Sequence, residues 1–67
     1  KGGNVPCALN AANEISVQAF LEDKIKFTDI ARINEETMSK TNFVKAPNLD
    51  DYIQTNKLAR AIAFKLI

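Results

Sequence analysis

Apolar residues recur with a helical period along the first third of the chain. The segment from Pro6 to about Asp23 predicts one helix, because at about 100° per residue most of its apolar side chains gather on one side. The residues on that side are Leu9, Ala12, Ser16, Val17, Ala19 and Phe20. An arc this wide is typical of a central helix that contacts more than one neighbour, so we expect Leu9 and Phe20 to belong to the core.

One polar residue, Asn13, lies in the middle of this apolar arc. A buried amide without a partner costs roughly 1–3 kcal/mol, so we expect the Asn13 side chain to be paired. Backbone groups inside helices already have partners, and the predicted partner is therefore a main-chain group in the link 24–28 or 41–47. The competing interpretation is that Asn13 faces the active-site cleft of a larger protein.

The rest of the chain predicts shorter helices. Thr28 and Asn48 are good N-caps, and a further capping residue at Asn56 predicts a break after Thr55. The last helix would bury Ile62. The four predicted helices cover about residues 6–23, 29–40, 49–54 and 57–66. No segment alternates with the period of a strand, so we expect an all-α bundle of three to four helices in a single domain, residues 1–67.

The length and the cysteine count indicate that this domain depends on a partner. A core of this size supplies only about 3–5 kcal/mol, and small domains usually add disulfides or a metal. The chain has one cysteine and no histidine, which excludes an internal disulfide and a zinc site of the Cys/His type. The sequence also begins at Lys1 without Met, which favours a piece of a longer protein.

Charge and hydropathy exclude two classes of partner. Nine Lys+Arg against eight Asp+Glu give a net charge of +1, which does not predict binding to nucleic acid. No apolar run approaches the roughly 20 residues that cross a bilayer, so no membrane segment is expected. A lone thiol fits a reducing compartment, and we expect the protein to be cytoplasmic.

The candidate catalytic groups are few. Cys7 cannot form a Cys–His pair within this chain, so a structural role is favoured for its thiol. Asp50 and Asp51 are adjacent and diverge on a helix, as do Glu35 and Glu36, so no metal site is expected. The residues therefore predict no catalytic, cofactor-binding or metal-ligating side chain in this chain, and its notable residues are structural: Asn13, Phe20, Leu9 and Ile62.

A long segment of the chain has a family resemblance. LNAANEISVQAFL followed by IKFTDI resembles the C-terminal helical domain of the 1-deoxy-D-xylulose 5-phosphate reductoisomerase family. The match starts near Gly2 with GGNVPCALNAANE, continues through AFLEDKIKFTDI and returns weakly at LDDYIQTNKLAR. The family often has an acid where this chain has Asn56, and an N-cap works with either residue.

The resemblance implies a parent enzyme. Such a parent would rearrange and reduce 1-deoxy-D-xylulose 5-phosphate to 2-C-methyl-D-erythritol 4-phosphate in non-mevalonate isoprenoid biosynthesis, with NADPH and a divalent metal, Mg²⁺ or Mn²⁺. It would be a homodimer, and its cofactor and metal sites would lie in other domains. The resemblance therefore implies that this chain binds no cofactor and supports the catalytic domain of the same polypeptide. The alternative is a free-standing helical module for protein interactions.

Overall fold

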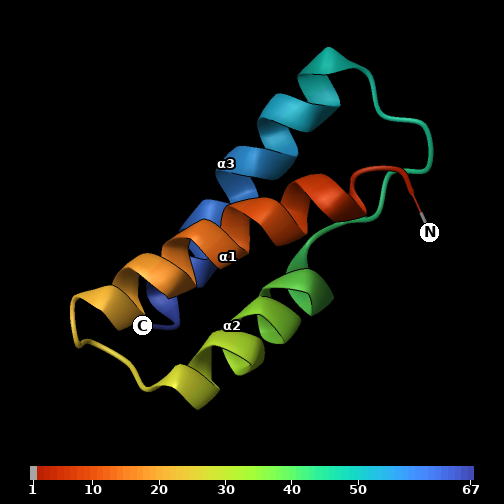
Figure 1. The fold of residues 1–67 in the computed structure, drawn as a ribbon. Helices are drawn as coiled ribbons and strands as arrows, with labels where there is room; N and C mark the ends of the chain where they lie inside the picture. The colour runs from red at the N-terminus through yellow and green to blue at the C-terminus, as the bar shows by residue number, and fades with distance from the viewer. Residues whose placement is uncertain (1) are drawn as a thin grey trace.

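Three helices make up the fold of residues 2–67, which are the residues that the computed structural model describes. The helices are α1 (Val5–Leu21), α2 (Phe27–Lys40) and α3 (Leu49–Lys65). In Figure 1, α1 lies between the other two, with α2 antiparallel to it on one side and α3 crossing it on the other. The described residues contain no strand, so the predicted all-α class is confirmed, with three helices.

Local features of the chain explain where helix α1 begins and ends. Pro6 lies in its first turn, where a missing N–H costs little. Its end is a Schellman motif: the amides of Asp23 and Lys24 donate to the carbonyls of Phe20 and Ala19, and Asp23 has a φ of 60°. Because that left-handed residue stops the helix, α1 ends at Leu21 and not at the predicted Asp23.

Helix α2 starts earlier than the sequence predicts. Thr28 is already inside the helix, and the capping position is taken by Lys26. The backbone amide of Lys26 donates to the carboxylate of Asp29, 2.9 Å away, so the acid fixes the first turn and the predicted Thr28 cap is wrong.

Helix α3 is continuous, so the predicted break after Thr55 is wrong. Its start is as predicted: the Asn48 side chain accepts from the Asp51 amide at 2.8 Å, and the Asp51 carboxylate accepts from the Asn48 amide at 3.1 Å. Asn56 does not cap a helix, because its side-chain oxygen accepts from Nε of Arg60 one turn later.

The core is made mainly of alanine. One buried cluster joins Ala8 and Ala11 of α1 to Ala59 of α3. A second joins Ala12, Ile33 and Ala63, one from each helix. Small side chains let α1 and α3 approach closely, and Ile33 is the only large apolar residue among the described residues that is fully buried.

Candidate functional site

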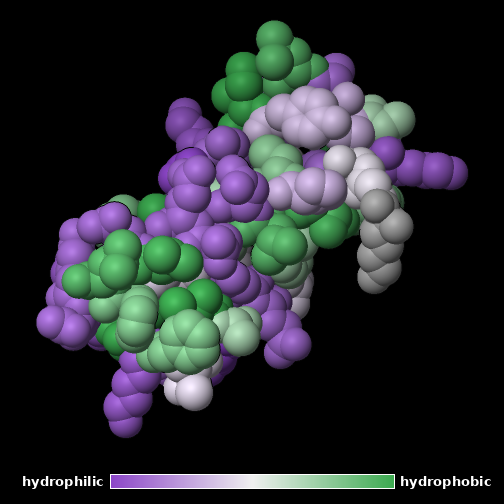
Figure 2. Space-filling view, viewed as in Figure 1, coloured by the Kyte–Doolittle hydropathy of each residue, from purple (hydrophilic) through white to green (hydrophobic). Residues whose placement is uncertain are grey.

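The first two turns of α3 carry an exposed apolar surface. Leu49, Tyr52 and Ile53 are spaced i, i+3, i+4 and so share one side of the helix. Their exposed fractions are 75%, 42% and 54%. We call these three residues the α3 apolar face. Figure 2 shows hydrophobic surface gathered over this end of α3 and again at the opposite end of the molecule.

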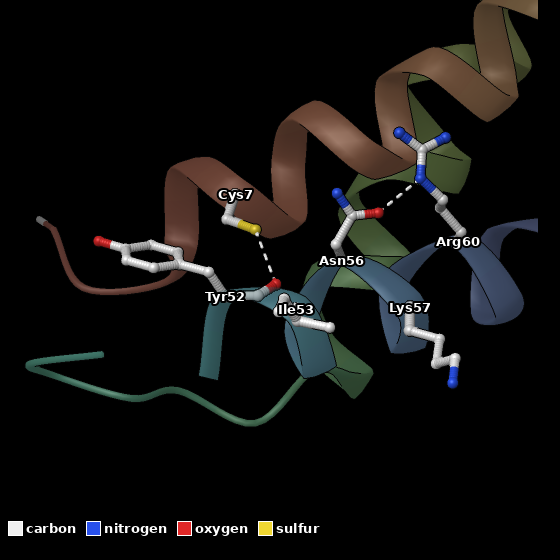
Figure 3. A pocket seen from close by; sticks show the side chains of 6 residues that line it. All are labelled: Cys7, Tyr52, Ile53, Asn56, Lys57 and Arg60. Atoms are coloured by element: carbon white, nitrogen blue, oxygen red, sulfur yellow. Dashed lines mark hydrogen bonds between the residues drawn. The ribbon is translucent and has the colours of Figure 1, made fainter. Parts of the chain in front are cut away.

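A shallow groove of about 440 Å³ runs beside this face, between α3 and the start of α1. Figure 3 shows its lining, in which the Cys7 side chain of α1 points toward the α3 backbone. The residues that line it are Cys7, Tyr52, Ile53, Asn56, Lys57 and Arg60. The Cys7 thiol donates to the Tyr52 carbonyl oxygen, with 3.6 Å between sulfur and oxygen, so it serves as a contact between helices. An apolar groove with cationic residues on its α3 wall suits a protein surface better than a reaction centre.

Arg60 closes one end of the groove with polar contacts across the two helices. Its guanidinium donates to the Asn56 side chain within α3 and to the Glu14 carboxylate of α1. The hydrogen bond and the positive charge of Arg60 lower the pKa of Glu14 below its usual value. Glu14 is therefore held as a carboxylate and is not poised to exchange a proton near neutral pH.

Two of the residues singled out from the sequence are more exposed than predicted. Leu9 is 45% exposed and lies outside both alanine clusters, so its predicted place in the core is wrong. Asn13 is exposed as well, and its side-chain oxygen accepts from the side-chain nitrogen of Asn34 in α2 at 3.0 Å. Its predicted burial and its predicted main-chain partner in a link are therefore both wrong.

The other two are half-buried. Phe20 packs edge-to-face on Phe27, with ring centroids 5.7 Å apart. Because Phe20 is only partly buried, replacing it by alanine should cost less than the about 3–5 kcal/mol expected for a fully buried aromatic residue. Ile62 is also half-buried, on the second half of α3 beside the buried Ala63.

The sequence did not single out Asn4, which does what was predicted for Asn13. Asn4 is 1% exposed, and its side-chain nitrogen donates to the Asn42 carbonyl at 2.7 Å and to the Thr55 hydroxyl at 2.9 Å. Its side-chain oxygen accepts from the Val44 amide at 2.8 Å, and its own amide donates to the Val44 carbonyl at 3.1 Å. We call these contacts the Asn4 junction. The one available signal was the neighbouring pair of glycines, which marks a segment of close backbone approach.

Neither a metal-binding group nor a membrane-spanning helix is found among the described residues. Within residues 2–67, no group of three or more His, Cys, Asp or Glu side chains could hold a metal ion. No helix in this part of the chain is both long and apolar enough to cross a membrane.

The family model and the similar proteins all indicate the same family. Residues 1–62 match the model described as "DXP reductoisomerase C-terminal domain". The chain is 49% identical over 67 residues to 1-deoxy-D-xylulose 5-phosphate reductoisomerase of Bacteroides fragilis and 51% identical over 67 residues to that of Bacteroides thetaiotaomicron. It is 50% identical over 66 residues to that of Ruminiclostridium cellulolyticum.

Length separates the chain from these relatives. The alignments cover 100%, 100% and 98% of the chain and only 17% of each relative, so the chain spans about one-sixth of their length. No solved structure matches.

Proposed function

Because the chain belongs to the DXP reductoisomerase C-terminal domain family, we propose that it supports the catalytic part of a longer reductoisomerase by packing against it. The whole protein would convert 1-deoxy-D-xylulose 5-phosphate to 2-C-methyl-D-erythritol 4-phosphate with NADPH and a divalent metal. In that longer protein this domain would contribute packing against the catalytic part.

The distribution of apolar side chains supports this role. The helices bury mainly alanines, while many larger apolar residues remain exposed on the outside. The large exposed apolar residues are Leu9, Leu21, Phe27, Phe43, Leu49, Tyr52, Ile53, Leu58, Phe64 and Ile67. Exposed apolar surface on this scale marks an interaction surface, because it is otherwise a liability for aggregation. The α3 apolar face is our candidate for the surface that meets the remainder of the protein.

The alternative, a free-standing helical module for protein interactions, would also explain an apolar surface. It has less support, since the relatives carry a similar sequence as about one-sixth of a longer chain.

The α3 apolar face can be tested in the complete enzyme with a matched pair of variants. Ile53→Asp places a carboxylate on the face, whereas Gln54→Asp adds the same charge at the next exposed position outside it. We expect Ile53→Asp to lower kcat/KM by about tenfold or more, because small displacements remote from the reacting atoms can cost that much. Gln54→Asp should leave it nearly unchanged, and equal effects of the two variants would contradict the docking role.

The 67-residue chain alone should show no NADPH oxidation with the sugar phosphate at any concentration of Mg²⁺ or Mn²⁺. Turnover by a preparation free of the complete enzyme would overturn the assignment of a purely supporting role.

A further inference from the structure

The first half of α3 has little apolar attachment to the rest of the domain. From Leu49 to Gln54 every residue is exposed or half-buried, and Thr55 is the first buried residue of the helix. The apolar anchors of α3 are Ala59 and Ala63, both in its second half. The α3 apolar face therefore lies on a segment that packing alone holds weakly.

The Asn4 junction supplies the missing attachment. The Asn4 side chain reaches the buried hydroxyl of Thr55, and it also holds Asn42 and Val44 in the segment between α2 and α3. One side chain thus ties together the start of α1, the α2–α3 segment and the middle of α3. In Figure 1 the N-terminal segment runs beside the α2–α3 segment, away from the end where α1 and α2 are linked. Buried hydrogen bonds of this kind are worth more than exposed ones, because breaking them leaves polar groups unpaired in the interior.

Gly3 makes the junction possible. It has a φ of 63°, and a Cβ atom at this position would collide with the carbonyl oxygen of Val44. The N-terminal segment can therefore lie against the α2–α3 segment only because residue 3 has no side chain.

We propose that Asn4 is a positioning residue that holds the first half of α3 in the orientation in which its apolar face docks onto the remainder of the enzyme. The proposal rests on the proposed function. A surface that is fixed before docking loses less conformational entropy on docking, so the Asn4 junction strengthens a contact that Asn4 itself does not make. The partner is the remainder of the same polypeptide, because the relatives carry this domain as a small part of one chain.

The test is hydrogen exchange measured on the complete enzyme. Ile53→Asp defines the docking footprint, which is the set of segments outside residues 1–67 whose amides exchange faster when the apolar face is damaged. Asn4→Ala should raise exchange in that same footprint and at Val44 by about tenfold or more, and by more than at the amide of Ile33 in the core of α2, which reports global unfolding. Asn13→Ala is the matched control, an exposed asparagine of α1, the helix that Asn4 precedes, and it should leave the footprint unchanged.

A milder pair of variants serves if Asn4→Ala fails to fold. Thr55→Val keeps the shape of the side chain and removes the hydroxyl that accepts from Asn4, whereas Thr55→Ser keeps the hydroxyl. We expect Thr55→Val to raise exchange in the footprint by about threefold and Thr55→Ser by less than about twofold.

Each outcome decides the proposal. Faster exchange confined to residues 42–44 would overturn the positioning role and leave the proposed function standing. If Asn4→Ala, Thr55→Val, Thr55→Ser and Ile53→Asp all left exchange outside residues 1–67 unchanged, both the positioning role and the proposed function would be overturned. Equal effects of Thr55→Val and Thr55→Ser would show that the hydroxyl is not the connection and would also overturn the positioning role.

Discussion

The two halves of α3 are held by different means. The second half packs Ala59 and Ala63 into clusters with alanines of α1 and with Ile33 of α2. In the first half, the six residues from Leu49 to Gln54 bury no side chain, and this part of the helix is attached through the hydrogen bonds from Asn4 to Thr55 and from the Cys7 thiol to Tyr52. One helix therefore combines a segment fixed by close packing with a segment fixed by directional polar contacts.

This difference separates stability from presentation. Close-packed small residues resist any change in volume, so the second half of α3 contributes to the stability of the domain through its packing on α1 and α2. The first half leaves its apolar side chains uncovered, and hydrogen bonds hold it in place without burying the surface that another part of the protein would need. Substitutions in the packed half should therefore change the stability of the domain, and substitutions in the hydrogen-bonded half should change how firmly that part of α3 is held in place.

The largest expected effect concerns the packed half. Ile33→Ala should destabilise the domain by about 2–5 kcal/mol, because it removes the fully buried side chain that fills the space between Ala12 and Ala63. Urea melts of the 67-residue chain with and without the substitution would measure this loss in the free energy of unfolding. Ile30→Ala, at a half-buried position of the same helix, is the control and should cost less. If Ile33→Ala cost under about 1 kcal/mol, the alanine clusters would not be the seat of stability.

A smaller effect is expected at the start of the polar half. Asn48→Ala should cost about 1 kcal/mol, because the Asp51 amide loses its side-chain acceptor at the helix start. The same change should speed amide exchange at Asp51 and leave Ala63 protected, since the two halves are attached independently. Asn48→Asp keeps an acceptor and should stay close to the parent sequence. An equal rise in exchange at Asp51 and Ala63 would show that α3 responds as one unit.

The sequence predicts the helices better than their faces. Periodicity located all three helices, and capping chemistry placed the start of α3 at Asn48. The predicted break after Thr55 failed because a capping residue type also fits inside a helix when its side chain finds another partner, which Asn56 finds in Arg60.

The faces failed for a different reason. Hydrophobicity favours large residues such as Leu9 as core candidates, whereas close helix approach buries Ala8 and Ala11 and leaves Leu9 outside. A buried asparagine was expected in the right chemical setting, a side chain that holds an irregular segment, but at position 13 and not at position 4. Periodicity along α1 cannot reveal a partner that lies 40 residues away, as Val44 does from Asn4.

The smallest expected effect concerns Asn13, and it calibrates the contrast between buried and exposed polar contacts. Asn13 bonds Asn34 across α1 and α2 at 3.0 Å, a distance similar to those at the Asn4 junction. Water can replace either partner of an exposed pair, so Asn13→Ala should change the free energy of unfolding by no more than about 0.5 kcal/mol. Asn4→Ala removes contacts of similar length in a buried setting and should cost roughly 1–3 kcal/mol, because it leaves polar groups unpaired. Thermal melts of the two variants side by side would measure the difference that burial makes. A loss above about 1 kcal/mol for Asn13→Ala would mean that exposed amide pairs also hold this bundle together, and the division of α3 into a packed half and a hydrogen-bonded half would lose its energetic basis.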